Sequence, residues 1–209
     1  MYTKPLFDPE SREEVFALID RAVFGTLVSS GPEGPVVSHL VFLLDRTRGE
    51  NGTLMSHLAA ANPHCEQIRH GAPSVAIFEG PHGYISSSWY PAKPVRDSAP
   101  TWNFSVVHAH GRPVLVDQKQ TIRHLHEVVE KMETGREGAW EMKELGPGGM
   151  PRRLPHVLAF EISVTRLEAK FKMGQDERAY DTLAAIEKLR EGGEADLAEM
   201  MRRKNVGRE

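Results

Sequence analysis

The chain has 209 residues, of which 40% are hydrophobic and 26% are charged, and its formal net charge is −3 with neutral histidines. This length and composition predict one globular domain, with or without a small appendage, and exclude a disordered chain. A negative balance leaves room for a local basic patch, but it gives no support for a nucleic-acid-binding face.

The single cysteine, Cys65, allows no disulfide within the chain, which is typical of a reducing compartment. Residues 1–14 are too polar for a signal peptide, and no apolar run approaches the length of a membrane span. We therefore expect a cytoplasmic protein without a membrane segment.

The N-terminal half predicts one helix followed by short strands. The helix begins around Asp8-Pro9-Glu10, where Asp8 can cap and Pro9 suits the first turn, and it ends before Gly25. Strands are predicted at 26–29, 36–44, 53–57, 73–79, 84–87 and 101–116, the last one bent near Gly111. Turns are predicted at 31–35, 51–52 and 80–83, a helical turn or two at 63–70 and a loop at 91–100. Short strands at this spacing predict an antiparallel barrel or sandwich.

The C-terminal half begins with the clearest helix, in which Asp117 and Gln120 have the spacing of a capping box. Its apolar stripe consists of Ile122, Leu125, Val128, Val129 and Met132. A Gly- and Pro-rich loop with short helical pieces is expected at 135–155, a strand at 157–167, and helices at about 176–190 and 194–204. Residues Leu158, Phe160, Ile162 and Val164 alternate along the strand and should share one face.

An aromatic and polar cluster is the first candidate site; its members are Ser86, Trp89, Tyr90, Thr101, Trp102 and Asn103. Trp and Tyr offer flat surfaces to a planar ring system, and the polar side chains beside them can hydrogen-bond ring edges or a phosphate. On composition alone, aromatic residues that fill a barrel are the commoner explanation.

Two further groups could recognise an anion. Ser38-His39, Ser56-His57 and Asn62 lie at predicted strand ends and could face one cleft, although ordinary rim histidines explain them as well. Lys172 and Gln175 precede a predicted helix, where a solvated strand end is the alternative.

No recognised catalytic or metal signature is present. The sequence contains no GxSxG, no P-loop and no GxGxxG after a strand. His108 and His110 should share a strand face and His124 and His126 should diverge on a helix, but neither pair comes with the ligands of a strong zinc signature. We expect no metal site.

Taken in chain order, these segments resemble the PaiB family of FMN-binding negative transcriptional regulators. The similar segments are Pro5-Leu6-Phe7, Gly25-Thr26-Leu27-Val28, Ser38-His39-Leu40-Val41-Phe42, Gly52-Thr53-Leu54 with His57, Ala61-Asn62-Pro63, Gly80-Pro81-His82-Gly83-Tyr84-Ile85-Ser86 with Trp89-Tyr90, Thr101-Trp102-Asn103-Phe104, Val106-Val107-His108-Ala109-His110-Gly111, and 162–172 with Gln175. The chain departs from the family pattern at Val41, at Ser87 and at Gly174-Gln175-Asp176-Glu177-Arg178.

The resemblance implies an α+β, mainly β fold: an antiparallel split β-barrel, related to flavoproteins of the pyridoxamine-phosphate-oxidase type, with peripheral helices. It implies a barrel domain at 1–173, a helical extension at 174–209, and a homodimer with FMN at the subunit interface. The implied FMN-binding residues are His39, Ser56, His57, Asn62, Ser86, Trp89, Tyr90, Thr101, Trp102, Asn103, Lys172 and Gln175.

The resemblance favours a regulator or sensor but fixes no reaction. The alternatives are a flavin-dependent oxidoreductase acting on a small molecule, in which the flavin would carry the redox chemistry, and a haem-binding split-barrel protein. Direct DNA binding has little support, because acidic residues dilute the basic residues of the last two helices.

Overall fold

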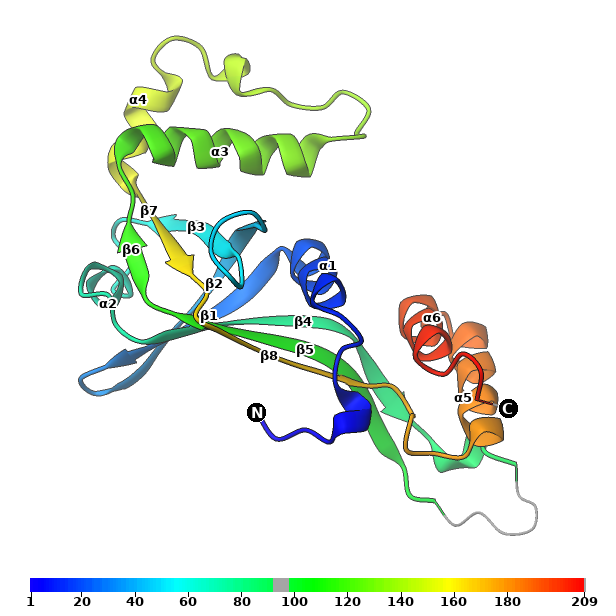
Figure 1. Cartoon of the computed structure of the whole chain (residues 1–209). Coiled ribbons are helices and arrows are strands. Elements are labelled where there is room, and N and C mark those ends of the chain that lie inside the picture. Colours follow the sequence, from blue (N-terminus) through cyan, green and yellow to red (C-terminus); the bar gives the residue numbers. More distant parts are fainter. Residues whose placement is uncertain (92–97, 209) are drawn as a thin grey trace. The chain divides into compact units, whose positions relative to one another are not determined.

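The computed structural model describes residues 1–91 and 98–208. Within these ranges, strands hydrogen-bond in one sheet of eight, in the order β6-β7-β3-β2-β1-β4-β5-β8. The strands are β1 (Phe24–Gly31), β2 (Gly34–Asp45), β3 (Thr53–Ala59), β4 (Ser74–Ile85), β5 (Thr101–Gly111), β6 (Pro113–Leu115), β7 (Val157–Ser163) and β8 (Arg166–Lys172). The predicted mainly β, antiparallel α+β class is confirmed (Figure 1).

Helices precede, separate and follow these strands. The α-helices are α1 (Arg12–Ala22), α2 (Cys65–Arg69), α3 (Gln118–Glu133), α4 (Gly149–Arg153), α5 (Ala179–Glu191) and α6 (Ala195–Lys204). Short 3-10 helices are η1 (Pro5–Phe7), η2 (Ser87–Trp89), η3 (Met142–Leu145) and η4 (Leu154–His156). No helix in the described part of the chain is both long enough and apolar enough to cross a membrane. The loop predicted at 91–100 falls largely on 92–97, outside the described residues.

The chain divides into two compact units, with one boundary between α1 and β1 and three within β4, β5 and β8. Unit 1 consists of Met1–Ala22, Glu79–Val107 and Glu168–Glu209, and unit 2 of Val23–Phe78 and His108–Leu167. The division into a domain at 1–173 and an extension at 174–209 stays a prediction.

The core of unit 2 comes from the inward residues of alternating strands. Phe42 on β2 and Phe78 on β4 meet edge to face, with ring centroids 5.4 Å apart. Leu54, Phe160 and Ile162 are fully buried beside them on β3 and β7. Helix α3 lies next to β3 and β7 (Figure 1). The expected buried face is confirmed at Phe160 and Ile162 of β7 and at Val164 directly after it, whereas Leu158 is only half-buried.

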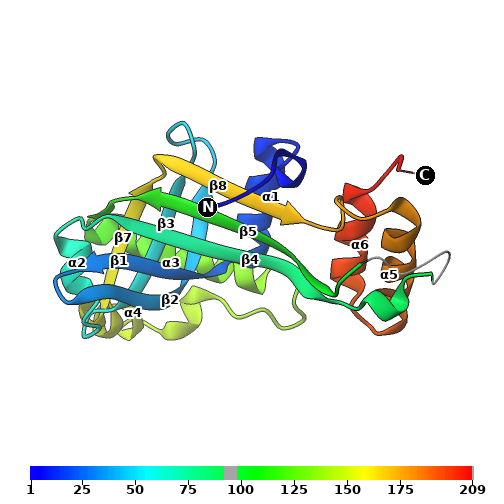
Figure 2. The same cartoon turned by 90° about the horizontal axis from the view of Figure 1, so that it is seen from below.

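The core of unit 1 is built around the two C-terminal helices, which pack side by side (Figure 2). Ile186 and Leu189 of α5 and Leu197 and Met201 of α6 are buried. Ile85 at the end of β4, Tyr90 directly after η2 and Met173 directly after β8 complete the same cluster. Both predicted helices are therefore present, and each uses one apolar face for this packing.

The structure confirms the Asp117 capping box: the Asp117 carboxylate accepts from Gln120 N at 2.7 Å, and Gln120 Oε1 accepts from Asp117 N at 3.2 Å. The predicted apolar stripe of this helix is only half-buried, and the buried positions are Thr121 and His124. Helix α1 begins at Arg12, later than predicted. Ser11 Oγ accepts from Glu14 N at 3.2 Å, while Asp8 ends the 3-10 helix η1.

Two strand predictions were wrong in their boundaries. The turn predicted at 80–83 does not form, and β4 runs through it. The strand has a glycine at position 80 for a packing reason: a Cβ there would come within 2.3 Å of Ser105 Oγ. The strand predicted at 157–167 is two strands, since β7 ends at Ser163 and β8 begins at Arg166. The bend predicted near Gly111 is confirmed, because it separates β5 from β6.

Candidate functional site

An exposed stack of two rings lies on the pair β1 and β2 in unit 2. The strand register places Thr26 opposite His39, and Thr26 Oγ1 lies 3.0 Å from His39 Nδ1. The Phe24 ring stacks on the imidazole, with centroids 6.2 Å apart and planes inclined by 30°. Phe24 is 63% exposed and His39 is also exposed. A flat apolar surface therefore stands next to an oriented hydrogen-bonding group, open to solvent.

Asn62 is held in place by a buried histidine. Its Nδ2 donates to Ser38 Oγ at 3.3 Å, and its Oδ1 accepts from His64 N at 2.9 Å. The His64 ring, fully buried, contacts Ser38 Oγ at 2.9 Å through Nδ1 and Ser29 Oγ at 2.8 Å through Nε2. Burial lowers the pKa of His64, so the ring is neutral and links β1, β2 and the start of α2. The sequence analysis did not identify His64, whose one visible signal is its position two residues after Asn62.

Ser56 and His57 point to opposite faces of β3. Ser56 is fully buried, and its Oγ donates to the Val41 carbonyl at 2.8 Å. His57 is half-buried and lies against α3, where its Nδ1 is 3.0 Å from His124 Nε2. Burial lowers the pKa of both histidines, and the nearby His57 lowers that of His124 further, to about 4. The pair is therefore neutral at physiological pH.

Unit 1 carries an exposed aromatic surface on β4 and β5. Trp102 is 51% exposed and stacks on His82, with centroids 6.0 Å apart and planes inclined by 26°. Tyr84, half-exposed, lies 6.4 Å from the Trp102 ring. Lys172 Nζ donates to Thr101 Oγ1 at 2.6 Å and to the Trp102 carbonyl at 3.3 Å. Partial burial lowers the pKa of Lys172. Thr101, Trp102 and Lys172 thus lie together at this edge of unit 1, and their role in binding FMN stays a prediction.

The remaining predicted residues of unit 1 have mainly structural contacts. Tyr90 belongs to the helical core, where burial, followed by Glu177 and Asp181, raises its pKa to about 12. Asn103 is buried, with Nδ2 3.5 Å from Met201 Sδ.

Three more predicted positions organise the local backbone. Ser86 caps η2 by accepting from Ser88 N at 3.2 Å, and Trp89 packs half-buried against the helical core. Gln175 bridges the backbone after β8, accepting from Met173 N at 2.6 Å and donating to the Phe171 carbonyl at 2.7 Å.

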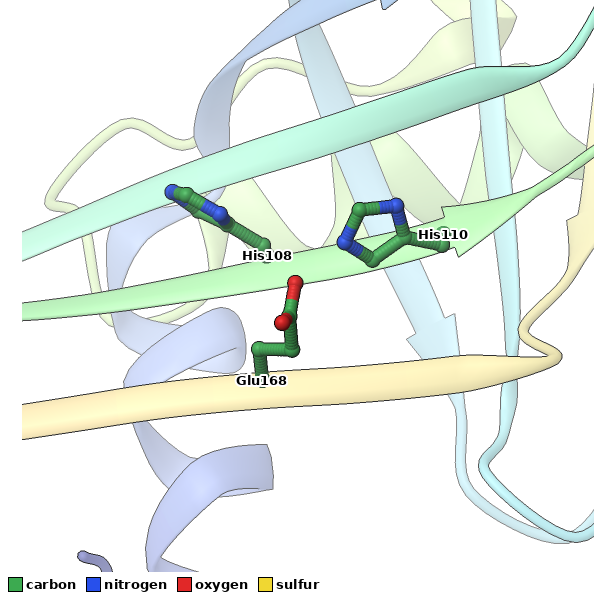
Figure 3. Close-up of side chains that lie close together, drawn as sticks. All are labelled: His108, His110 and Glu168. Carbon is green, nitrogen blue, oxygen red and sulfur yellow. The ribbon is translucent and has the colours of Figure 1, made fainter. Parts of the chain in front are cut away.

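His108 and His110 lie on the same side of β5, as predicted (Figure 3). Their ring centroids are 6.3 Å apart and their planes are inclined by 68°. Arg166 donates to His110 Nδ1 at 3.2 Å. Glu168, also labelled in Figure 3, belongs to unit 1.

Similar solved structures define the class of fold. The flavocytochrome Anf3 from Azotobacter vinelandii superposes with a TM-score of 0.64 at 17% identity, over 83% of this chain and 73% of that one. The FAD and heme binding protein from Mycobacterium smegmatis gives a TM-score of 0.60 at 15% identity, over 79% and 73% of the two chains. At these identities the likeness shows the fold alone, and it confirms the predicted split β-barrel.

The family follows from the sequence. Residues 1–166 match the family described as "Putative FMN-binding domain", and the chain belongs to it. The chain is 28% identical to the "Protease synthase and sporulation protein PAI 2" of Bacillus subtilis over 189 aligned residues. The alignment covers 90% of this chain and 89% of that protein. The resemblance to the PaiB family is thereby confirmed.

Proposed function

We propose that this protein binds FMN and acts as a flavin-loaded sensor or negative regulator of transcription, of the PaiB type. The observation that carries the proposal is the exposed stack of Phe24 and His39 in a chain of this family. A flavin needs a flat apolar surface for its ring and oriented donors for its polar edge and phosphate. The β1–β2 surface of unit 2 offers an oriented imidazole beside an exposed ring, and the Trp102 surface of unit 1 offers a second flat face.

The residues of the proposed site form two groups. The first group, nearer the phosphate, consists of His39, His57 and Asn62, with Thr26 orienting His39. The second group, nearer the ring, consists of Ser86, Trp89, Thr101, Trp102 and Lys172. We leave out four predicted residues whose side chains are buried or bonded to the backbone: Ser56, Tyr90, Asn103 and Gln175.

We further propose a two-fold symmetric homodimer with two equivalent FMN sites at the interface. Phe24, Val37, Tyr84 and Trp102 are each at least half-exposed, at 63%, 53%, 50% and 51%. Large apolar side chains in this state favour an interface over open solvent. A second copy would cover them, and a cleft between copies could gather ligand groups that are distant in the sequence.

The cofactor proposal is tested by titrating flavin-free protein with FMN and with riboflavin, which lacks the phosphate, while following flavin fluorescence. His39→Ala should weaken FMN binding about ten-fold, the size expected for a charge-assisted hydrogen bond, and riboflavin binding much less. His126→Ala, at an exposed position on α3, is the matched control and should change neither affinity. Failure of the unaltered protein to bind any flavin would overturn the proposal.

The assembly is tested by light scattering on the flavin-free and FMN-loaded protein. We expect a dimer, and we expect Trp102→Ala to weaken dimerisation or to change flavin fluorescence. Trp140→Ala, in the segment of unit 2 between α3 and η3, should do neither. A monomer that binds FMN with full affinity would contradict the shared site while leaving flavin binding intact.

A further inference from the structure

A network of polar side chains in unit 2 ends at Asn62, a residue of the proposed flavin site. Its members, in order of contact, are the Ala72 carbonyl, Ser74, Ser29, His64, Ser38 and Asn62. Ser74 on β4 lies directly opposite Ser29 on β1 in the strand register, which brings their hydroxyl oxygens to 2.6 Å. The three serines and the histidine are buried. Their hydroxyl and imidazole protons can therefore be assigned by asking which atom must donate in each contact.

The direction of the hydrogen bonds follows from the Ala72 end. A carbonyl oxygen only accepts, so the single hydroxyl proton of Ser74 goes to Ala72, at 2.8 Å. Ser74 Oγ must then accept from Ser29, which uses the only hydroxyl proton of Ser29. Ser29 Oγ is left to accept from His64 Nε2 at 2.8 Å. The His64 ring, which burial keeps neutral by lowering its pKa, therefore carries its proton on Nε2.

The same direction follows independently from the Asn62 end. The backbone N–H of His64 can only donate, so the Asn62 atom 2.9 Å from it is the oxygen Oδ1. Nδ2 then faces Ser38 Oγ at 3.3 Å and donates to it. The hydroxyl proton of Ser38 goes to His64 Nδ1 at 2.9 Å, the nitrogen that has no proton of its own. Both ends thus require the same state of the imidazole.

This arrangement fixes the amide of Asn62 and leaves one of its donors unused. Nδ2 has two hydrogens, and the second has no acceptor among the described residues. Turning the amide over would set Nδ2 against the His64 N–H and Oδ1 against the Ser38 oxygen, which would lose two hydrogen bonds. Asn62 is half-buried, so the unused hydrogen is within reach of a ligand. The amide therefore offers a donor before any ligand arrives.

We propose that Ser29, Ser74 and His64 are positioning residues that make the flavin site selective for the phosphate of FMN. The inference rests on the proposed function, in which Asn62 lies at the phosphate end of the site. These three residues act through Ser38, by holding the Asn62 amide in the orientation that presents its Nδ2 hydrogen. An ionised phosphate oxygen accepts hydrogen bonds, and a donor already held in place binds it without a further ordering cost.

The first test compares the affinities of flavin-free protein for FMN and for riboflavin, which lacks the phosphate, by fluorescence titration. Ser29→Ala and Ser74→Ala should each weaken FMN binding about five-fold, the size of one neutral hydrogen bond, and leave riboflavin binding unchanged. Ser30→Ala, the next residue of β1 and exposed, is the matched control and should change neither affinity. A merely structural role for the two serines would lower both affinities together. Thermal unfolding of each variant checks that it is folded.

The second test reads the network without any flavin. Nitrogen-15 NMR of histidine-labelled protein distinguishes a proton on Nε2 from one on Nδ1, and the His64 signals are identified by their loss in His64→Asn. We expect the Nε2 form in the unaltered protein and in Ser30→Ala, and a changed His64 spectrum in Ser29→Ala. A proton on Nδ1 in the unaltered protein overturns the proposal, and so does an unchanged ratio of FMN to riboflavin affinity in both serine variants.

The two readouts separate the failure of this inference from the failure of the proposed function. If Asn62→Ala weakens FMN binding but Ser29→Ala and Ser74→Ala do not, the flavin site stands and the positioning role is refuted. If the protein binds no flavin while His64 carries its proton on Nε2, the proposed function fails, and the positioning role fails with it although the network is present.

Discussion

Nδ1 of His57 on β3 lies 3.0 Å from Nε2 of His124 on α3, and the two rings meet edge to face with centroids 5.1 Å apart. His124 is only 1% exposed, and its Nδ1 has no hydrogen-bond partner among the described residues. One imidazole donates to the other, and burial, which lowers the pKa of both rings, keeps both neutral in the folded protein at physiological pH. This pair links the helix to the sheet by a contact that depends on protonation.

The first prediction concerns pH. The folded pKa of His124 is about 4, below the ordinary value of 6.5, because burial and then His57 disfavour the cation. The unfolded chain therefore takes up a proton at higher pH than the folded protein, and stability is lost as the pH falls from about 6.5 towards 4. The shift is equivalent to about 3 kcal/mol. Denaturant unfolding measured across this range should show it.

A pair of variants isolates this effect. His124→Gln keeps a polar contact to His57 but removes one titrating group, so the loss of stability between pH 6.5 and 4 should shrink. His126→Gln, two residues further on and exposed, should keep the full pH dependence. Identical slopes for the two variants would refute the assignment to His124.

This pairing could not be predicted from the sequence. His57 and His124 are 67 positions apart, and strand and helix patterns place each on an element without saying which faces meet. The Asp117 capping box was predictable because both of its hydrogen bonds are local. The family resemblance supplied the fold, which no local pattern could define beyond a barrel or sandwich.

Tertiary contacts explain where the structure departs from local sequence patterns. Gly80-Pro81-His82-Gly83 has turn composition, yet it lies in a strand that packs closely on its neighbours, Gly80 against Ser105 and Gly83 against the end of Leu197. Asn103 and Tyr90 have the chemistry of ligand-binding side chains but are buried by tertiary packing. The end of β5 and the start of β8 meet at one pocket of unit 2, and this brings together three residues distant in the sequence: His110, Arg112 and Arg166.

The second prediction concerns Gly80. Gly80→Ala would place a Cβ 2.3 Å from Ser105 Oγ and 3.1 Å from Leu18 Cδ1, so it should reduce the free energy of unfolding by about 1–3 kcal/mol. Adding Ser105→Ala removes the closer contact and should recover part of the loss. Gly83→Ala meets only the flexible end of Leu197, at 2.8 Å, and should cost less. A larger cost at Gly83 than at Gly80 would contradict this account.

The third prediction compares two lysines of the C-terminal helices. Lys204 is 5% exposed, donates to Glu14 at 2.6 Å and to Glu10 at 3.2 Å, and lies over the Phe171 ring at 4.9 Å. Lys204→Met should lower the free energy of unfolding by about 1–3 kcal/mol, because Glu14 loses a partly buried partner. Lys188 is 50% exposed in its pair with Glu191, so Lys188→Met should change stability by less than about 0.5 kcal/mol. Equal losses would show that burial is not what distinguishes the two pairs.

The fourth prediction concerns DNA. In the sequence, the basic residues of α5 and α6 are the only candidate group for contacting DNA, and within the described residues each of the five is ion-paired. Within the described residues, Lys188 pairs with Glu191, Arg190 with Glu187, Arg202 and Arg203 with Glu199, and Lys204 with Glu10 and Glu14. Contacting DNA would require these pairs to break, which removes much of the electrostatic gain.

We therefore expect the isolated protein to show weak, salt-sensitive binding without sequence preference, measured by fluorescence anisotropy on operator-length fragments at physiological salt. Glu199→Gln releases Arg202 and Arg203 together, so it should strengthen this non-specific binding and steepen its dependence on salt. Glu191→Gln releases only Lys188 and should have a smaller effect. A tight complex of the unaltered protein that resists competitor DNA would show that another surface carries the recognition, and regulation would then be direct.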